Sequence, residues 1–295
     1  MSEANRDEEH GAAQGPGPVV FFSNPLMSDS ESDWSAVHNA SFTGRALALQ
    51  TLLSQGACVN LATLDRVTPL FGACHQGHAL CARLLIQNGA HVNSATVDGS
   101  TPLSEACARG HVTCVSLLLQ HGANPLGPGG HAPSPIHMAA AKGHPECVSA
   151  LVERGADVDQ RRDRSGTPLH AAVANRHPST ARKLLQLGAS VNSSVDGDSL
   201  LHTAARLSST EMVSVLMEHG ADCSVKNSEG KRPVDLAPPN SLVERMLGKS
   251  RGLCVCRVFV LCWVSWLMAQ ILGFSVPQPW VFSAGPGLHP SSGTP

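Results

Sequence analysis

Four residues of the types that bind zinc lie within eight positions of one another: Cys74, His75, His78 and Cys81. Two thiolates and two imidazoles at this spacing could hold a tetrahedral Zn²⁺ ion. The same His-x-x-Cys pair recurs, however, at His111 and Cys114 and again at His144 and Cys147. A slot that repeats has a structural explanation, with histidine bonded to the turn backbone and cysteine packed as a small apolar residue. We therefore predict no metal and no other cofactor.

Catalytic motifs are equally weak. Gly248-Lys249-Ser250 resembles the end of a phosphate-binding loop, but that loop needs a glycine where Val243 stands, and no nucleophile elbow is found. Most of the fifteen histidines fall on repeating positions, which favours structural roles. Six lie outside those positions, and we expect them to be exposed: His75, His91, His121, His131, His177 and His219. We predict that the protein is not an enzyme.

An internal repeat positions these residues. The dipeptide Gly-Ala recurs, with steps of 33, 33, 33, 33 and 32, at Gly56, Gly89, Gly122, Gly155, Gly188 and Gly220. A second marker, typified by Thr-Pro-Leu, keeps the same register and begins at Thr68, Thr101, Ser134, Thr167 and Ser199. A fixed period of this length is typical of stacked structural units.

Each unit has the sequence of two short helices and a turn. A Thr or Ser hydroxyl should cap the first helix, with proline at its first position. Glycines such as Gly77 should end the first helix, and leucine pairs such as Leu84-Leu85 give the second helix an apolar face. The glycine of Gly-Ala should end that helix in the left-handed conformation. We predict an all-α solenoid of six to seven helix–turn–helix units with short β-hairpin fingers, held together by stacking.

The chain divides into three predicted regions. Residues 1–32 form an acidic arm rich in Gly, Pro and Ser, which we expect to be disordered. Residues 33–247 form the repeat domain, and residues 248–295 form an atypical hydrophobic tail. The units are placed at about 33–64, 65–97, 98–130, 131–163, 164–195 and 196–228, with a partial one at 229–247. Altered curvature is expected at unit four, whose finger is rich in Gly and Pro, and at unit six, which is one residue short.

Composition limits the classes of partner. The net charge is -2 and only 15% of residues are charged, so no strong field favours nucleic acid. Aromatic residues are 4% with no Tyr, which disfavours a β-sandwich or barrel. Ten cysteines in 295 residues are too few for a disulfide scaffold. The charged start has no apolar segment of a secretory signal, and we predict a cytoplasmic protein.

Stacked fingers and first helices create an extended concave surface, the usual place where repeats bind protein. We predict a folded target protein as the partner and no nucleic acid. The side chains expected to contact it are on the fingers, on the exposed helix positions and in a basic run: Arg66, Asp98, Ser100, Glu105, Arg109, His131, Met138, Lys142, Arg161, Arg162, Arg164 and Asp198.

The Thr-Pro-Leu-His and Gly-His markers resemble the ankyrin repeat. More specific segments are Ser23-Asn24-Pro25-Leu26-Met27, then Ser134-Pro135-Ile136-His137, and Glu229 to Pro239 at the end of the array. These resemble the ankyrin repeat and SOCS box protein family. The resemblance implies an array that recruits a target for ubiquitination, and a C-terminal box that binds elongin B/C and a cullin in a RING-type E3 ligase.

The tail departs from the pattern of that box. The family's box begins Leu-x-x-x-Cys, whereas Leu253 is followed four positions later by Arg257. We therefore expect an alternative C-terminus that replaces the box and leaves target binding in place. Residues 258–276 carry no charge and are marginally long enough to span a bilayer. A membrane tail anchor on an ankyrin adaptor unrelated to ubiquitin is the alternative.

Overall fold

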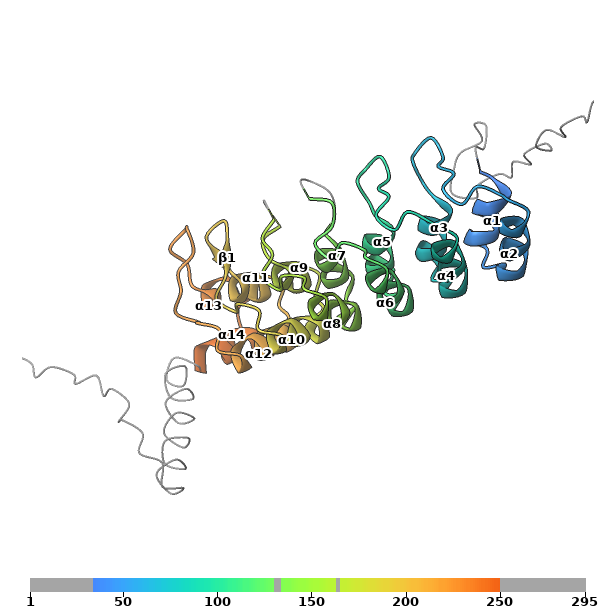
Figure 1. Cartoon of the computed structure of the whole chain (residues 1–295). Coiled ribbons are helices and arrows are strands. Elements are labelled where there is room, and N and C mark those ends of the chain that lie inside the picture. The colour runs from blue at the N-terminus through green and yellow to red at the C-terminus, as the bar shows by residue number, and fades with distance from the viewer. Residues whose placement is uncertain (1–33, 130–133, 163–164, 250–295) are drawn as a thin grey trace, which may run out of the picture.

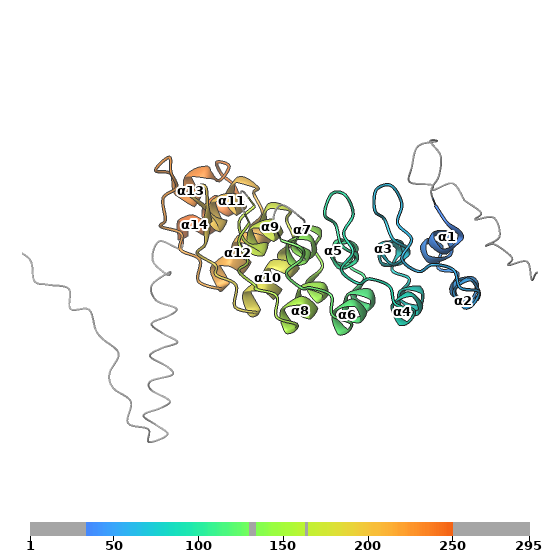
Figure 2. The same ribbon diagram turned by 45° about the horizontal axis from the view of Figure 1, so that its top comes forward.

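A computed structural model describes residues 34–129, 134–162 and 165–249. Helices stack in pairs along a solenoid (Figure 1). The inner row, on the side of the fingers, consists of α1 (Ala36–Phe42), α3 (Pro69–Gln76), α5 (Pro102–Arg109), α7 (Pro135–Lys142), α9 (Pro168–Ala174), α11 (Leu200–Arg206) and α13 (Pro233–Leu236). The outer row consists of α2 (Ala46–Ser54), α4 (Ala79–Gln87), α6 (Val112–Gln120), α8 (Pro145–Glu153), α10 (Pro178–Gln186), α12 (Thr210–Glu218) and α14 (Leu242–Lys249). Each helix packs on its partner and on the next helix of its own row (Figure 2).

The core is one continuous apolar layer between the two rows. Each inner helix from α1 to α11 contributes a buried aliphatic side chain, such as Leu70, Leu103 or Ile136, at its second position, whereas Val234 of α13 is half-buried. The outer helices contribute Leu85, Leu118 and equivalents. Small residues between them, including the buried cysteines of the repeating slot, allow the helices to approach closely. The predicted role of these cysteines as small apolar residues is confirmed.

Most of the expected helix ends are also confirmed. Thr68 Oγ1 accepts a hydrogen bond from Phe71 N, at 3.3 Å, at the start of α3, and proline follows at the first helical position. Gly77, Gly110 and Gly143 end their helices with φ near +80°. Unit four differs, because the Ser134 hydroxyl donates to Gln160 Oε1 at 2.7 Å and does not cap α7.

A ladder of histidines joins each turn to the preceding unit. His111 Nε2 donates to the His75 carbonyl at 3.2 Å, and His144 Nε2 donates to that of Ala108 at 3.2 Å. His177 belongs to the same ladder, since its Nε2 donates to the Ala141 carbonyl at 3.0 Å. Its predicted exposure is wrong, because Arg176 takes the left-handed position (φ 61°) that glycine holds in other units and so places His177 in the slot. His75 and His219 are also only half-exposed.

Among the described residues, one finger contains strands. β1 (Ser194–Val195) pairs antiparallel with β2 (Asp198–Ser199), with Val195 opposite Asp198. Other described fingers close through backbone hydrogen bonds at their base, such as Thr63 N to Val67 O at 3.0 Å, and the one at Arg162 and Gly166 forms an isolated antiparallel bridge. The predicted hairpins are thus mostly tight loops with too few paired residues to count as strands.

A polar seam links the bases of successive fingers. Asn60 Oδ1 accepts from His91 N at 2.9 Å, and Asn93 Oδ1 accepts from Asn124 N at 2.9 Å. Asp159 and Asn192 repeat the contact farther along. Leu126 occupies the equivalent place between Asn93 and Asp159 and has no polar atom in its side chain. The side-chain link is therefore missing at one step of the seam.

Candidate functional site

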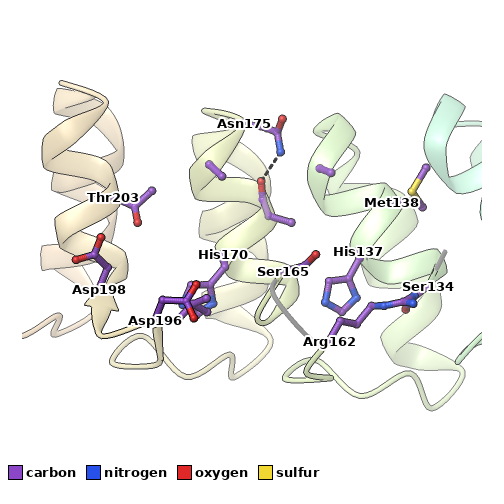
Figure 3. A pocket seen from close by; sticks show the side chains of 14 residues that line it. Ser134, His137, Met138, Arg162, Ser165, His170, Asn175, Asp196, Asp198 and Thr203 are labelled. Atoms are coloured by element: carbon purple, nitrogen blue, oxygen red, sulfur yellow. Dashed lines mark hydrogen bonds between the residues drawn. The ribbon is translucent and has the colours of Figure 1, made fainter. Parts of the chain in front are cut away.

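A groove of about 660 Å³ crosses the concave side of units four to six (Figure 3). Its floor is made by small or flexible side chains of α7 and α9: Met138, Ala141, Ala171 and Ala174. Its walls come from the fingers, from α7, α9 and α11 and from the C-terminal end of α9: Ser134, His137, Arg162, Ser165, His170, Asn175, Val195, Asp196, Asp198 and Thr203. The groove therefore joins an apolar floor to polar walls.

Alanine accounts for the hollow. The outward position of α9 that carries Ala171 is matched in α5 by the much longer Glu105. Short side chains leave space between neighbouring fingers, which project past them (Figure 3). A concave site with a few polar groups around an apolar base is typical of a binding site.

Charge on the walls is mixed. Arg162 lies on one finger, which is closed by two backbone hydrogen bonds between Arg162 and Gly166, of 2.9 and 3.0 Å. Asp196 and Asp198 stand on the next finger. Asp198 accepts from Arg206 Nη2 at 2.7 Å and from Asn227 Nδ2 at 2.9 Å. Burial opposes the effect, but these hydrogen bonds hold the pKa of Asp198 below its usual value, so its carboxylate is charged near neutral pH.

Two histidines of the walls are nearly covered. His137 and His170 are 7% and 9% exposed. Burial lowers the pKa of His137, helped by Arg162 and opposed by its bond to Gly166. Burial lowers the pKa of His170, and the positive charge of Arg161 lowers it further, whereas a hydrogen bond with the Ser193 backbone raises it. Both rings are therefore neutral at pH 7.

Three predicted contact residues meet in this groove: Met138, Arg162 and Asp198. Arg161 is exposed beside it, and its Nη2 donates to the Ser194 carbonyl at 2.8 Å, which ties the finger of unit five to that of unit six. Arg161 therefore has a structural contact that the sequence did not indicate.

A second polar cluster lies on units two and three. Arg109 Nε donates to Glu105 Oε1 at 3.2 Å, and Arg109 Nη2 lies 2.6 Å from His75 Nε2. The Glu105 carboxylate is 3.6 Å from His75. Burial and the neighbouring Arg109 lower the pKa of His75, so the imidazole accepts from the guanidinium. This cluster is separate from the groove residues.

The remaining predicted residues are spread over the surface. Arg66 is an exposed fingertip with φ 60°, and Lys142 is exposed in the last turn of α7. Asp98 accepts hydrogen bonds from the hydroxyls of Thr96 and Ser100 in its own finger. These bonds lower the pKa of the Asp98 carboxyl, and the bond from Thr96 has the larger effect. His131 and Arg164 lie outside the described residues, as do the arm before Trp34 and the tail after Lys249.

The predicted structural role of the motif histidines is confirmed for His137, which bonds the Gly166 carbonyl, and for His170, which bonds Thr167, but the sequence did not indicate that both also line the groove. Sequence reasoning also missed Asp196 and the alanine floor. The signal was available in part, since the run of alanines in α7 and α9 predicts a hollow. Within the described ranges, no three His, Cys, Asp or Glu side chains are placed to hold a metal ion. No helix in those ranges is long and apolar enough to cross a membrane.

Comparisons with known proteins agree with this architecture. Ankyrin repeat models match residues 37–127, 126–195 and 196–228. The solved human ASB11 ankyrin repeat domain is 44% identical, covers 74% of this chain and 98% of its own, and has a TM-score of 0.70. The ankyrin repeat domain of Bcl-3 is 30% identical, covers 74% of this chain and all of its own, and has a TM-score of 0.62.

Shorter segments match curated relatives. Ankyrin repeat and SOCS box protein 5 of Bos taurus is 56% identical over 50 residues, which are 17% of this chain and 15% of that protein. Ankyrin repeat and SOCS box protein 9 of Mus musculus is 46% identical over 64 residues, 21% of this chain and 22% of that protein. The matches thus span under a quarter of these relatives. With helix pairs, fingers and groove in place, the chain belongs to the ankyrin repeat family of protein-interaction modules, and its repeats are similar to those of ankyrin repeat and SOCS box proteins.

Proposed function

We propose that this chain captures a folded target protein on its concave surface, in the manner of the substrate-recognition part of an elongin–cullin–RING ubiquitin ligase. We further propose that this form holds the target without a working SOCS box. The groove across units four to six is the observation that carries the proposal, since three of the predicted contact residues, Met138, Arg162 and Asp198, line it. The names of the similar proteins connect such repeats to a SOCS box.

The groove suits a protein partner better than a small metabolite. It is bounded by two fingers and by helices α7, α9 and α11, and Arg162 and Asp196 place opposite charges on neighbouring fingers. Rims of this kind give specificity and register, while the desolvated floor around Met138 supplies binding energy. The target would therefore insert a side chain or a short segment and rest on the fingers around it.

Capture from cells tests the proposal. The tagged full chain and the full chain fused to a competent SOCS box are compared for elongin C, a cullin and shared prey. We expect common prey for both and elongin only with the fusion. An Arg162→Ala variant should lose prey, and Arg182→Ala, an exposed arginine on the outer helix α10, should retain it. Absence of any shared prey, or equal capture by both variants, contradicts the proposal.

The alternative is a membrane-anchored ankyrin adaptor. It rests on the uncharged residues 258–276, which lie outside the described residues. A carbonate wash distinguishes the two, because a spanning segment stays with the membrane. Retention of the full chain on washed membranes would favour the membrane-anchored adaptor, and its release into the wash would contradict that alternative.

A further inference from the structure

The carboxyl ends of four neighbouring inner helices carry a row of cations. Helices α5, α7, α9 and α11 run in the same direction and pack side by side (Figure 1). Each has a basic residue at its end or just beyond it: Arg109, Lys142, Arg176 and Arg206. All four side chains are exposed and follow one border of the concave face, which we call the basic edge.

Acidic neighbours balance the two ends of the basic edge. At one end, Arg109 Nε donates to Glu105 Oε1 at 3.2 Å. At the other end, Arg206 Nη2 donates to Asp198 Oδ2 at 2.7 Å. The outermost positive charges are therefore compensated within the array itself.

The centre of the basic edge is not balanced in this way. Within the described residues, Lys142 and Arg176 take part in no ion pair. Two further exposed carboxylates, Glu146 and Glu211, lie in the first turns of outer helices at this side of the array, and neither forms an ion pair with them. Two neighbouring units thus present uncompensated positive charge to solvent.

Arg176 holds its charge at a position that suits glycine. Its φ is 61°, and the matching residue of unit four is Gly143, with φ 82°. This conformation is unfavourable for a residue with a Cβ. A Cβ at Gly143 would also lie 2.6 Å from His177 Nδ1, but unit six has Ser209 in place of the next ladder histidine, so that clash is absent at Arg176. Strained residues cluster at functional sites, and a cation held at this position calls for an explanation.

The chain contains an acidic complement to this edge. Residues 1–33 hold seven acidic residues and one arginine, a net charge of -6, so the rest of a chain of net charge -2 carries +4. Three of these acids are consecutive and form what we call the acidic run: Asp7, Glu8 and Glu9. The acids at 29–33 lie within five residues of Trp34 and reach at most about 17 Å from it. The acidic run is therefore the part of the arm that can act at a distance.

The length of the arm matches the distance to the centre of the basic edge. Trp34, where the arm joins unit one, is 3% exposed, and Glu9 precedes it by 25 residues. A coil of that length spans about 28 Å. Packed helices lie about 8–10 Å apart, so α7 is about 24–30 Å and α9 about 32–40 Å from α1. The acidic run can therefore reach Lys142 and Arg176 without full extension, and its tether raises its local concentration there.

We propose that the acidic run of the arm binds Lys142 and Arg176 of the same chain. The residues immediately before these cations, Ala141 and Asn175, line the groove, so the bound arm covers the groove from the side of the turns. The inference goes beyond the proposed function, because the contact needs no target protein.

A carbodiimide tests this contact in the full chain, since it joins a carboxylate to a nearby lysine amine as an amide. Lys142 is compared with Lys183, which lies on the outer helix α10 at a similar distance along the array. Peptide mass spectrometry should find about tenfold more bonding of the acidic run to Lys142 than to Lys183, within single chains. The yield at Lys142 should fall severalfold at about 1 M salt, where the screening length is about 3 Å.

Three results of this experiment overturn the proposal. They are the absence of bonds from the acidic run to Lys142, equal bonding to Lys142 and Lys183, and bonding found only in dimers. The last result would assign the basic edge to the arm of a second copy.

Matched arginine variants test the edge itself. Arg176→Gly removes a central charge and introduces the glycine that other units have, so it should fold at least as stably as the unaltered chain. Arg182→Ala removes an exposed arginine from the outer row. We expect bonding at Lys142 to fall about threefold in Arg176→Gly and to stay unchanged in Arg182→Ala. Equal yields in the two variants refute the contact. Neither reading involves prey, so the proposed function is judged separately by Arg162→Ala.

Discussion

Two glycines with the same backbone conformation should respond differently to one added methyl group. Gly110 has φ 76° and Gly122 has φ 83°, so alanine is strained at both. A Cβ at Gly110 would lie 2.5 Å from His144 Nδ1, whereas a Cβ at Gly122 would meet nothing within 4 Å. The left-handed conformation costs alanine about 1–2 kcal/mol at either place. At Gly110 the imidazole must also move, which loses its bond to the Ala108 carbonyl, worth about 1 kcal/mol, and some packing.

We therefore expect Gly110→Ala to lower the free energy of unfolding by about 3 kcal/mol and Gly122→Ala by about 1 kcal/mol. Urea unfolding monitored by circular dichroism measures both, with a check that the transition stays two-state. His144→Ala in the Gly110→Ala background should recover part of the loss, because the colliding ring is gone. Equal losses for the two glycines, or no recovery in the double variant, would refute the role of the histidine ladder.

The remaining predictions concern pH, packing and thiols. Burial lowers the pKa of His137 and His170 below the unfolded value of about 6.5, so the unfolded chain binds more protons below that pH. Urea midpoints should consequently be constant above about pH 6.5 and fall as the pH drops, less so in His137→Gln; a flat profile would count against the buried neutral rings. Leu118→Ala removes a fully buried side chain and should cost about 3 kcal/mol, against under about 0.5 kcal/mol for the exposed Leu80→Ala in the same denaturation assay. Among the described thiols, iodoacetamide should label Cys58 and Cys223 in the native protein, while Cys147, whose pKa burial raises to about 11, reacts only after unfolding; peptide mass spectrometry would show otherwise if Cys147 kept pace with Cys58.

Most of the fold could be predicted from the sequence because each unit repeats the same local signals. Threonine caps, proline at the first helical position and glycine at the turns act within a few residues, so their spacing fixes the helices. Arg176 and Ser208 adopt positive φ where other units have glycine, and this could not be predicted because stacking, not local preference, holds them there.

The candidate site was predictable only in part. Met138, Arg162 and Asp198 lie in the groove because the repeat register places those positions on the concave side. The altered contacts of His137 and His170 depend instead on the choice of Gln160 by the Ser134 hydroxyl and on a one-residue shortening in the unit after His170. These are contacts between units, and a single-unit pattern contains no information about them.

Leu126 has a mechanical consequence for the join between units four and five. The other described steps of the seam fasten finger to finger through an Asn or Asp side chain. At this step the contacts with the next finger come instead from the start of α7, where Ser134 Oγ donates to Gln160 Oε1 and His137 Nε2 donates to the Gly166 carbonyl. Ser134 and His137 also line the groove, so a partner that presses on its wall would load the same two contacts that join these units.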